Sequence, residues 1–181
     1  MSHKPRKRFG QNFLNDEGVL DTIVHHFNPK VDDHIVEIGP GQGALTRPIL
    51  SKCNHLTVIE LDRDLISGLE ALQLEHPNVQ MEIVNLDVLE VDFNQIESSQ
   101  DKIRVIGNLP YNISTPLMIS LLAYLDRITD MCFMLQKEVA DRLMAQPGTK
   151  AYGRLSVMMQ YHCDMSAVIQ VPPTAFDPPP K

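Results

Sequence analysis

The sequence is poor in the residue patterns that bind metals or form disulfides. Its three cysteines, Cys53, Cys132 and Cys163, are far apart and form no C-x-x-C pair. Its seven histidines form no H-E-x-x-H motif or other ligand cluster, so no metal is implied. An odd number of separated cysteines is typical of free thiols in a reducing cytosol. We therefore expect a cytoplasmic protein without a disulfide framework.

Long apolar runs and a uniformly basic surface are also missing. No stretch is long enough to cross a membrane, and no signal-type apolar region follows the charged start. The formal net charge of −7 argues against a uniformly basic nucleic-acid-binding surface. Basic charge is local instead, at Lys4, Arg6, Lys7 and Arg8. These side chains belong either to an RNA-binding arm or to a solvated tail.

The sequence does contain enough apolar residues for the core of one domain, since 43% of its 181 residues are hydrophobic. Strand-like and helix-like patterns alternate along it, which predicts an α/β fold with a mainly parallel sheet and helices on both faces. The expected strands are 34–38, 55–60, 79–84, 102–107, 131–135 and 166–171. The fifth of them is nearly all apolar and is therefore expected at the centre of the sheet.

Three segments differ in character. Residues 1–14 form a basic arm whose apolar end folds back onto the domain, residues 15–171 form the main domain, and residues 172–181 form an extended proline-rich tail. Asn15 is expected to cap the first helix, which ends near Phe27. Phe176 in the tail either faces a bound base or anchors the tail to the core.

A glycine-rich turn, Gly39 to Ala44 (GPGQGA), follows the first expected strand and precedes a helix. In this arrangement glycines let the backbone approach a nucleotide closely. Glu60 ends the next strand 21 positions after Gly39, near the spacing at which an acid meets ribose hydroxyls. The turn also satisfies G-x-G-x-x-A, so a nicotinamide dinucleotide site stays open, and Glu60 alone is equally a solvated charge.

Asp87 follows the third expected strand. At the carboxyl end of a strand it is placed to accept a hydrogen bond from the adenine amino group of a cofactor. The alternative is an ordinary acidic residue in a loop.

The segment Asn108-Leu109-Pro110-Tyr111 follows the fourth expected strand and precedes Thr115-Pro116, a helix start with Thr as N-cap. Its residue types suit the presentation of an aromatic amine to an electrophile. The Asn108 side-chain oxygen and the Leu109 carbonyl can accept the two amine hydrogens, which localises the nitrogen lone pair. Pro110 fixes φ, and Tyr111 can stack on the base. A plain turn that ends a strand is the alternative.

Six motifs in order resemble one family over residue 6 to the last residue: RKRFGQNFL (6–14), VEIGPGQG (36–43), VIELDRD (58–64), GNLPYNISTP (107–116), FMLQKE (133–138) and AYGRLSV (151–157). Together they are similar to the bacterial KsgA/RsmA family, S-adenosylmethionine-dependent small-subunit ribosomal RNA adenine dimethyltransferases. The resemblance implies a class I methyltransferase fold in residues 15–171. It also implies dimethylation of N6 on two adjacent adenosines near the 3′ end of 16S rRNA, with a role in ribosome biogenesis.

Site residues follow from the resemblance. It places Asn12 and Leu14 over the cofactor S-adenosylmethionine, Gly39 beneath its methionine part, and Glu60 on its ribose hydroxyls. It places Asp87 on the adenine amine and Asn108 between cofactor and target base. The product would be S-adenosylhomocysteine, no metal is required, and we expect a monomer that binds rRNA and no membrane.

The family continues beyond the proline-rich stretch with a last strand and a small helical domain, so we expect a truncated chain with an open edge in its sheet. Two alternatives stay open. One is a 23S rRNA adenine N6-methyltransferase of the macrolide-resistance type, and the other is a non-catalytic ribosome-assembly factor that binds RNA. A nicotinamide dehydrogenase would need a Tyr-x-x-x-Lys pair, which the sequence lacks.

Overall fold

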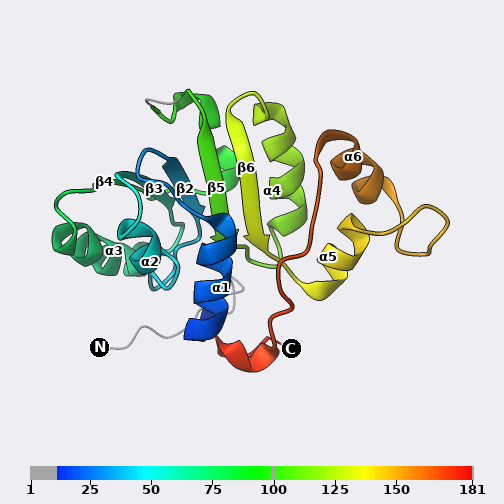
Figure 1. The fold of residues 1–181 in the computed structure, drawn as a ribbon, viewed down its shortest axis with the longest axis horizontal. Coiled ribbons are helices and arrows are strands. Elements are labelled where there is room, and N and C mark those ends of the chain that lie inside the picture. Colours follow the sequence, from blue (N-terminus) through cyan, green and yellow to red (C-terminus); the bar gives the residue numbers. More distant parts are fainter. Residues whose placement is uncertain (1–11, 99–100, 181) are drawn as a thin grey trace.

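A single parallel sheet organises the chain in the computed structural model, which describes residues 12–98 and 101–180. Its strands are β2 (His34–Ile38), β3 (His55–Ile59), β4 (Gln80–Val84), β5 (Ile103–Asn108) and β6 (Ile128–Met134), in the order β4-β3-β2-β5-β6. All four pairings are parallel. Helices pack on both faces (Figure 1), so the predicted α/β fold is confirmed.

Two strand predictions are wrong. Strand β6 forms the edge of the sheet and not its centre, and residues 166–171 form no strand. Both differences have one cause. Among the described residues no strand pairs with the outer edge of β6, and an extended segment without a neighbour cannot form a ladder of hydrogen bonds. The apolar composition of β6 reflects packing on its faces, where Met131 and Phe133 contact one core cluster and Cys132 and Met134 the other.

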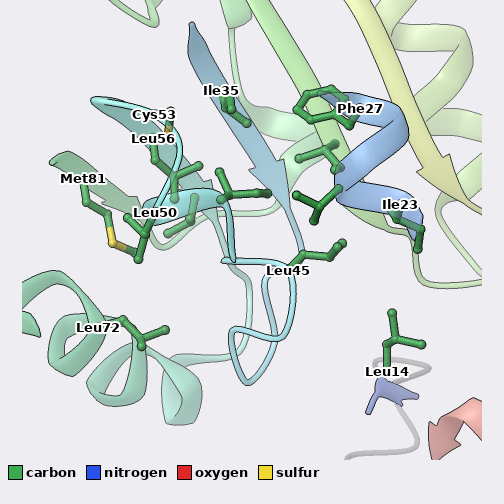
Figure 2. Close-up of a cluster of buried hydrophobic side chains, with 14 of the residues drawn as sticks. Leu14, Ile23, Phe27, Ile35, Leu45, Leu50, Cys53, Leu56, Leu72 and Met81 are labelled. Carbon is green, nitrogen blue, oxygen red and sulfur yellow. The ribbon is translucent and has the colours of Figure 1, made fainter. Parts of the chain in front are cut away.

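One face of the sheet is covered by α1 (Glu17–Phe27), α2 (Thr46–Leu50) and α3 (Arg63–Glu75). Figure 2 shows their side chains gathered against Ile35 and Leu56 of the sheet. Helix α1 presents Val19, Ile23, Val24 and Phe27 to this cluster, as its apolar spacing predicts. The predicted cap is one residue early: Asp16 and not Asn15 caps α1, and its carboxylate accepts the Val19 N–H at 3.0 Å.

The other face is covered by α4 (Ser114–Leu121) and by the short 3-10 helices η2 (Val88–Glu90), η3 (Phe93–Gln95) and η4 (Leu122–Tyr124). Thr115 does not cap α4, which corrects the predicted helix start. The backbone is already helical at Ile113, and both Ile113 and Ser114 donate to the Pro110 carbonyl at 3.2 Å. Helices α5 (Lys137–Leu143) and α6 (Arg154–His162) share a smaller cluster beside α4.

The arm and the tail pair with each other. Strand β1 (Phe13–Leu14) is antiparallel to β7 (Phe176–Asp177), and the 3-10 helix η5 (Pro173–Ala175) precedes β7. Leu14 and Ala175 are both buried in the cluster of Figure 2, where Leu14 is labelled. At Phe13 and Leu14 the end of the arm returns to the domain as predicted, whereas a wholly extended tail is wrong. No helix of the described residues is both long and apolar enough to span a bilayer.

Candidate active site

A cleft lies where β2, β3, β4 and β5 end, the edge at which open α/β sheets bind ligands. Its empty volume, part of it open to solvent, is about 1250 Å³. Every predicted site residue that the structure describes lines it: Asn12, Leu14, Gly39, Glu60, Asp87, Asn108, Leu109, Pro110, Tyr111 and Phe176. Lys4, Arg6, Lys7 and Arg8 lie outside the described residues. Loops after separate strands therefore meet in one place.

The glycine turn forms one wall of the cleft. Gly39 and Gly41 have φ values of 66° and 59°, a region that costs little only for glycine. The Gly39 N–H donates to the Ile59 carbonyl at 2.9 Å, which ties the turn to β3. A Cβ on Gly41 would lie 3.0 Å from two ring atoms of Phe13. The arm therefore lies directly against the turn, and a side chain at position 41 would separate them.

Glu60 is buried, with 7% of its surface exposed. One carboxylate oxygen accepts the Gly41 N–H at 3.1 Å, and the other accepts the Asp62 N–H at 2.8 Å. Burial raises the pKa of Glu60, and these two N–H donors oppose that rise. Each carboxylate oxygen has two lone pairs, so the side chain is held in place and can still accept from a ligand.

Glu37 is a second buried acid in the cleft wall, which the sequence analysis did not single out. It is 1% exposed and accepts the Thr46 hydroxyl at 2.7 Å. Burial raises the pKa of Glu37 to about 8, with a further rise from the nearby Glu60 carboxylate and an opposing effect of the Thr46 bond. Glu37 is therefore mostly protonated at neutral pH. Its place in VEIGPG, one residue before the strand ends, was the available signal.

Asp87 and Asn85 shape the cleft after β4. Asp87 caps η2, and one of its carboxylate oxygens accepts the Leu89 N–H at 3.0 Å. The Asn85 side chain donates to the Glu60 carbonyl at 2.7 Å. Asn85 thereby joins the ends of β3 and β4 and sets the position of Glu60 relative to Asp87. No local pattern in the sequence marks Asn85, because its partner is 25 residues away.

The Asn108–Tyr111 segment forms the opposite wall. Asn108 is the last residue of β5 and is half-buried. Its side-chain N–H donates to the Asn12 carbonyl of the arm at 3.0 Å. The Leu109 N–H donates to the Met134 carbonyl at 3.1 Å. Within residues 12–98 and 101–180, no donor bonds the Asn108 side-chain oxygen or the Leu109 carbonyl. Desolvation raises the pKa of the half-buried Tyr111.

Gly107 determines how closely the two walls approach. It pairs with Ile38 across β5 and β2, and a Cβ at this position would lie 2.5 Å from the Ile38 carbonyl oxygen. Only glycine permits this spacing. Since Ile38 precedes the glycine turn and Gly107 precedes Asn108, the same contact fixes the distance between both sides of the cleft.

The model of the family described as Ribosomal RNA adenine dimethylase matches residues 2–181. The chain belongs to this family. It is 55% identical over 179 residues to Ribosomal RNA small subunit methyltransferase A of Acinetobacter baylyi, covering 99% of this chain and 65% of that protein. It is also 55% identical over 183 residues to the protein of the same name from Psychromonas ingrahamii, covering 100% of this chain and 66% of that one. The chain thus spans just under two thirds of these curated relatives.

Solved structures show the same fold. A dimethyladenosine transferase from Plasmodium falciparum has a TM-score of 0.84 and 30% identity over 93% of this chain and 59% of its own. The 23S rRNA methyltransferase ErmE has a TM-score of 0.78 and 28% identity over 94% of this chain and 66% of its own. The predicted class I methyltransferase fold and the predicted family are therefore confirmed.

Among the described residues, no three His, Cys, Asp or Glu side chains gather as a metal site would require. The polar groups of the cleft are instead carboxylates, amides and main-chain carbonyls around a glycine turn. Such a set can hold a nucleoside with a charged side chain and orient an amine beside it.

Proposed function

We propose that this chain carries the catalytic domain of an S-adenosylmethionine-dependent enzyme that dimethylates N6 of two adjacent adenosines near the 3′ end of 16S rRNA. One observation carries the proposal: Asn108 and Leu109 line the same cleft as Gly39, Glu60 and Asp87, and each offers an oxygen that no described donor occupies. Family membership and the identity to small-subunit methyltransferases support it.

The cleft fits the cofactor. The Glu60 carboxylate is fixed by two N–H donors and retains lone pairs for a ribose diol. Gly39 leaves its side of the turn open, because a Cβ there would meet nothing closer than 3.7 Å. Asp87 uses one oxygen for the Leu89 N–H and retains the other for an adenine amine. Asn12 and Leu14 would close the arm over the bound nucleoside. The cofactor supplies an activated methyl group.

The other wall of the cleft would prepare the target amine. The lone pair of an exocyclic amine is delocalised into its ring, so the amine is a poor nucleophile. When the Asn108 side-chain oxygen and the Leu109 carbonyl each accept one of its hydrogens, the nitrogen becomes more tetrahedral and its lone pair localises. Tyr111 stacks on the base, a contact worth about 1–3 kcal/mol, which offsets part of the cost of unstacking it.

In this mechanism most of the rate enhancement comes from holding the target amine and the methyl donor in the reactive geometry. No strong base is needed, because N6 becomes very acidic on methylation and passes its proton to the Asn108 oxygen or to water. A second transfer requires room for the first methyl group. The enzyme is proposed to act as a cytoplasmic monomer, and the free cysteines Cys53, Cys132 and Cys163 suit a reducing compartment.

Transfer of tritiated methyl groups to purified 30S subunits, with 23S rRNA as the competing substrate, tests the proposal. We expect labelled N6,N6-dimethyladenosine in 16S rRNA only. Label in 23S rRNA would favour the macrolide-resistance type of activity instead. Calorimetric binding of S-adenosylmethionine without product in either RNA would favour a non-catalytic assembly factor.

A further inference from the structure

The amide of Asn108 is held in one of its two orientations by the arm. Its Nδ2 donates to the main-chain carbonyl of Asn12 at 3.0 Å, across 96 positions of sequence. A carbonyl oxygen can only accept a hydrogen bond, so this contact places the NH₂ group toward the arm. The Asn108 oxygen is then on the side away from Asn12, and no described donor occupies it.

The position of the Asn12 carbonyl depends in turn on the tail. Asn12 directly precedes β1, whose Phe13 and Leu14 pair with Asp177 and Phe176. At the other end of β1, the Asn15 N–H donates to the Ala175 carbonyl at 2.9 Å. Ala175 is 1% exposed and belongs to the main core cluster. We call β1, Asn15 and residues 175–177 together the arm–tail clasp.

We propose that the arm–tail clasp positions Asn108 for methyl transfer, with the Asn12 main-chain carbonyl as the group that keeps the amide oxygen directed to the substrate amine. This inference rests on the proposed function. An amide rotated by 180° would present its NH₂ group to the substrate's NH₂ group, donor against donor, and could not localise the lone pair. The clasp therefore acts through Asn108, and Asn12 is a positioning residue in this role.

Through the clasp, the pairing of the arm with the tail affects the orientation of the Asn108 side chain. The sheet alone fixes the backbone of Asn108, because β5 pairs with β2 and β6 on its two sides. Rotation about the last side-chain bond is left to the clasp. A chain with an intact sheet and a displaced tail is therefore expected to bind its cofactor and to transfer methyl groups slowly even when the cofactor is saturating.

Two matched variants test this role. Ala175→Asp introduces a charge at a buried site of the clasp, and Thr174→Asp introduces the same charge one residue earlier, at an exposed site. Circular dichroism and thermal melting confirm that each variant retains its sheet. Leu14→Ala, which weakens β1 from the arm side, serves if Ala175→Asp does not fold.

The first readout needs no substrate. In ¹⁵N-labelled protein the Asn108 side-chain NH₂ signals, assigned by their loss in Asn108→Ala, should show one proton protected from exchange with water. We expect Ala175→Asp to abolish this protection and Thr174→Asp to retain it. Asn12→Ala should also retain it, because it removes a side chain and keeps the main-chain carbonyl.

The second readout is kcat for methyl transfer at saturating S-adenosylmethionine. We expect at least a tenfold decrease for Ala175→Asp and a change of less than twofold for Thr174→Asp. Equal Asn108 protection in both Asp variants would overturn the inference, and so would loss of protection with an unchanged kcat, or a lower kcat with protection intact. A wild-type chain that methylates neither rRNA would overturn the proposed function, and the exchange measurement would still report whether the clasp holds the amide.

Discussion

The polar side chains at the two ends of strand β5 differ in how many of their hydrogen-bonding groups already have partners. Near its start, Arg104 uses all of its donors: it bonds Asp130 through two nitrogens at 2.9 and 2.8 Å, Asp33 at 2.6 Å, and the carbonyls of Phe27 and Asn28 at 2.6 and 3.3 Å. Its guanidinium also lies 4.2 Å from the centroid of the Phe27 ring. Nothing is left for a ligand.

Four residues later, Asn108 uses its donor on the arm and leaves its acceptor unoccupied by any described residue. The Leu109 carbonyl beside it is similarly available. A saturated polar network stabilises a fold, whereas fixed groups with spare hydrogen-bonding capacity indicate a binding site. Variants at the two ends should therefore fail in different ways.

Asn108→Ala should have the largest effect. It removes the proposed acceptor without opening a core cavity, so methyl transfer should fall by orders of magnitude while the dissociation constant for S-adenosylmethionine changes by only a few-fold. Single-turnover assays and calorimetry measure the two quantities. Asn94→Ala, at an exposed position, is the control. Near-wild-type turnover of Asn108→Ala would refute the role assigned to it.

Arg104→Met should fail by loss of stability. It removes the guanidinium that bonds Asp33, Asp130 and two carbonyls, at a cost of roughly 2–4 kcal/mol. This is below the full range for buried pairs because Asp130 is 46% exposed and Asp33 still accepts the Lys30 N–H. Urea unfolding measures the cost. Activity per folded molecule should be unchanged.

Arg47→Met is the matched control for Arg104→Met. Its ion pair with Glu75 spans 3.7 Å and both side chains are more than half exposed, at 59% and 60%, so the loss should be below about 1 kcal/mol. Similar losses in the two variants would mean that the fully hydrogen-bonded Arg104 contributes no more to the free energy of unfolding than an exposed ion pair does.

Gly107→Ala should affect stability and activity together, because its Cβ would push β5 away from the Ile38 carbonyl between the two walls of the cleft. We expect a loss of roughly 1–3 kcal/mol, as for overpacked cores. Weaker cofactor binding should accompany it. In Gly68→Ala a Cβ meets nothing within 4 Å on α3, and this control should gain about 0.5–1 kcal/mol.

Glu37→Gln should have the smallest effect, and one that depends on pH. Since the folded chain keeps the Glu37 proton up to a pKa of about 8 and the unfolded chain loses it near 4.5, folding takes up a proton between these values. Stability therefore falls as pH rises through this window.

Glutamine does not titrate. The melting temperature of Glu37→Gln minus that of wild type should therefore be higher at pH 8 than at pH 5. At least a few degrees is expected, since 1 kcal/mol corresponds to about 2–4 °C for a chain of this size. The new NH₂ group needs a partner at both pH values, so its cost does not change this difference. Glu70→Gln, at an exposed position, is the control variant. A pH-independent difference for Glu37→Gln would contradict the raised pKa.

Much of the fold could be predicted because it depends on local patterns. Strand β2 occupies its predicted residues, and β3, β4 and β5 begin and end within one residue of prediction. Apolar spacing and glycine placement act over a few positions, so the sequence shows them directly. Gly39, Glu60, Asp87 and Asn108 could be placed at the cleft for the same reason, as each lies at or just after the end of a recognisable strand. Asn12 and Leu14 were expected there only from the family resemblance.

Contacts between distant positions could not be predicted. Asn85 reaches Glu60, Asn12 reaches Asn108, and Gly107 meets Ile38, and no local pattern marks any of these pairs. The placement of β6 at the edge and the lack of a strand at 166–171 have the same origin, because a strand exists only where another chain segment pairs with it.

Sequence alone determined the alternation of strands and helices, the glycine turn, and the acidic and amide residues at successive strand ends, since these depend on side-chain chemistry and short-range backbone preference. Tertiary structure alone decided which of those polar groups are saturated and which remain open, that Glu37 holds its proton, and that the arm, paired with the tail, bonds Asn108 through the Asn12 carbonyl. Hydrogen-bond saturation and desolvation are properties of neighbours in space, and the chain acquires those neighbours only when it folds.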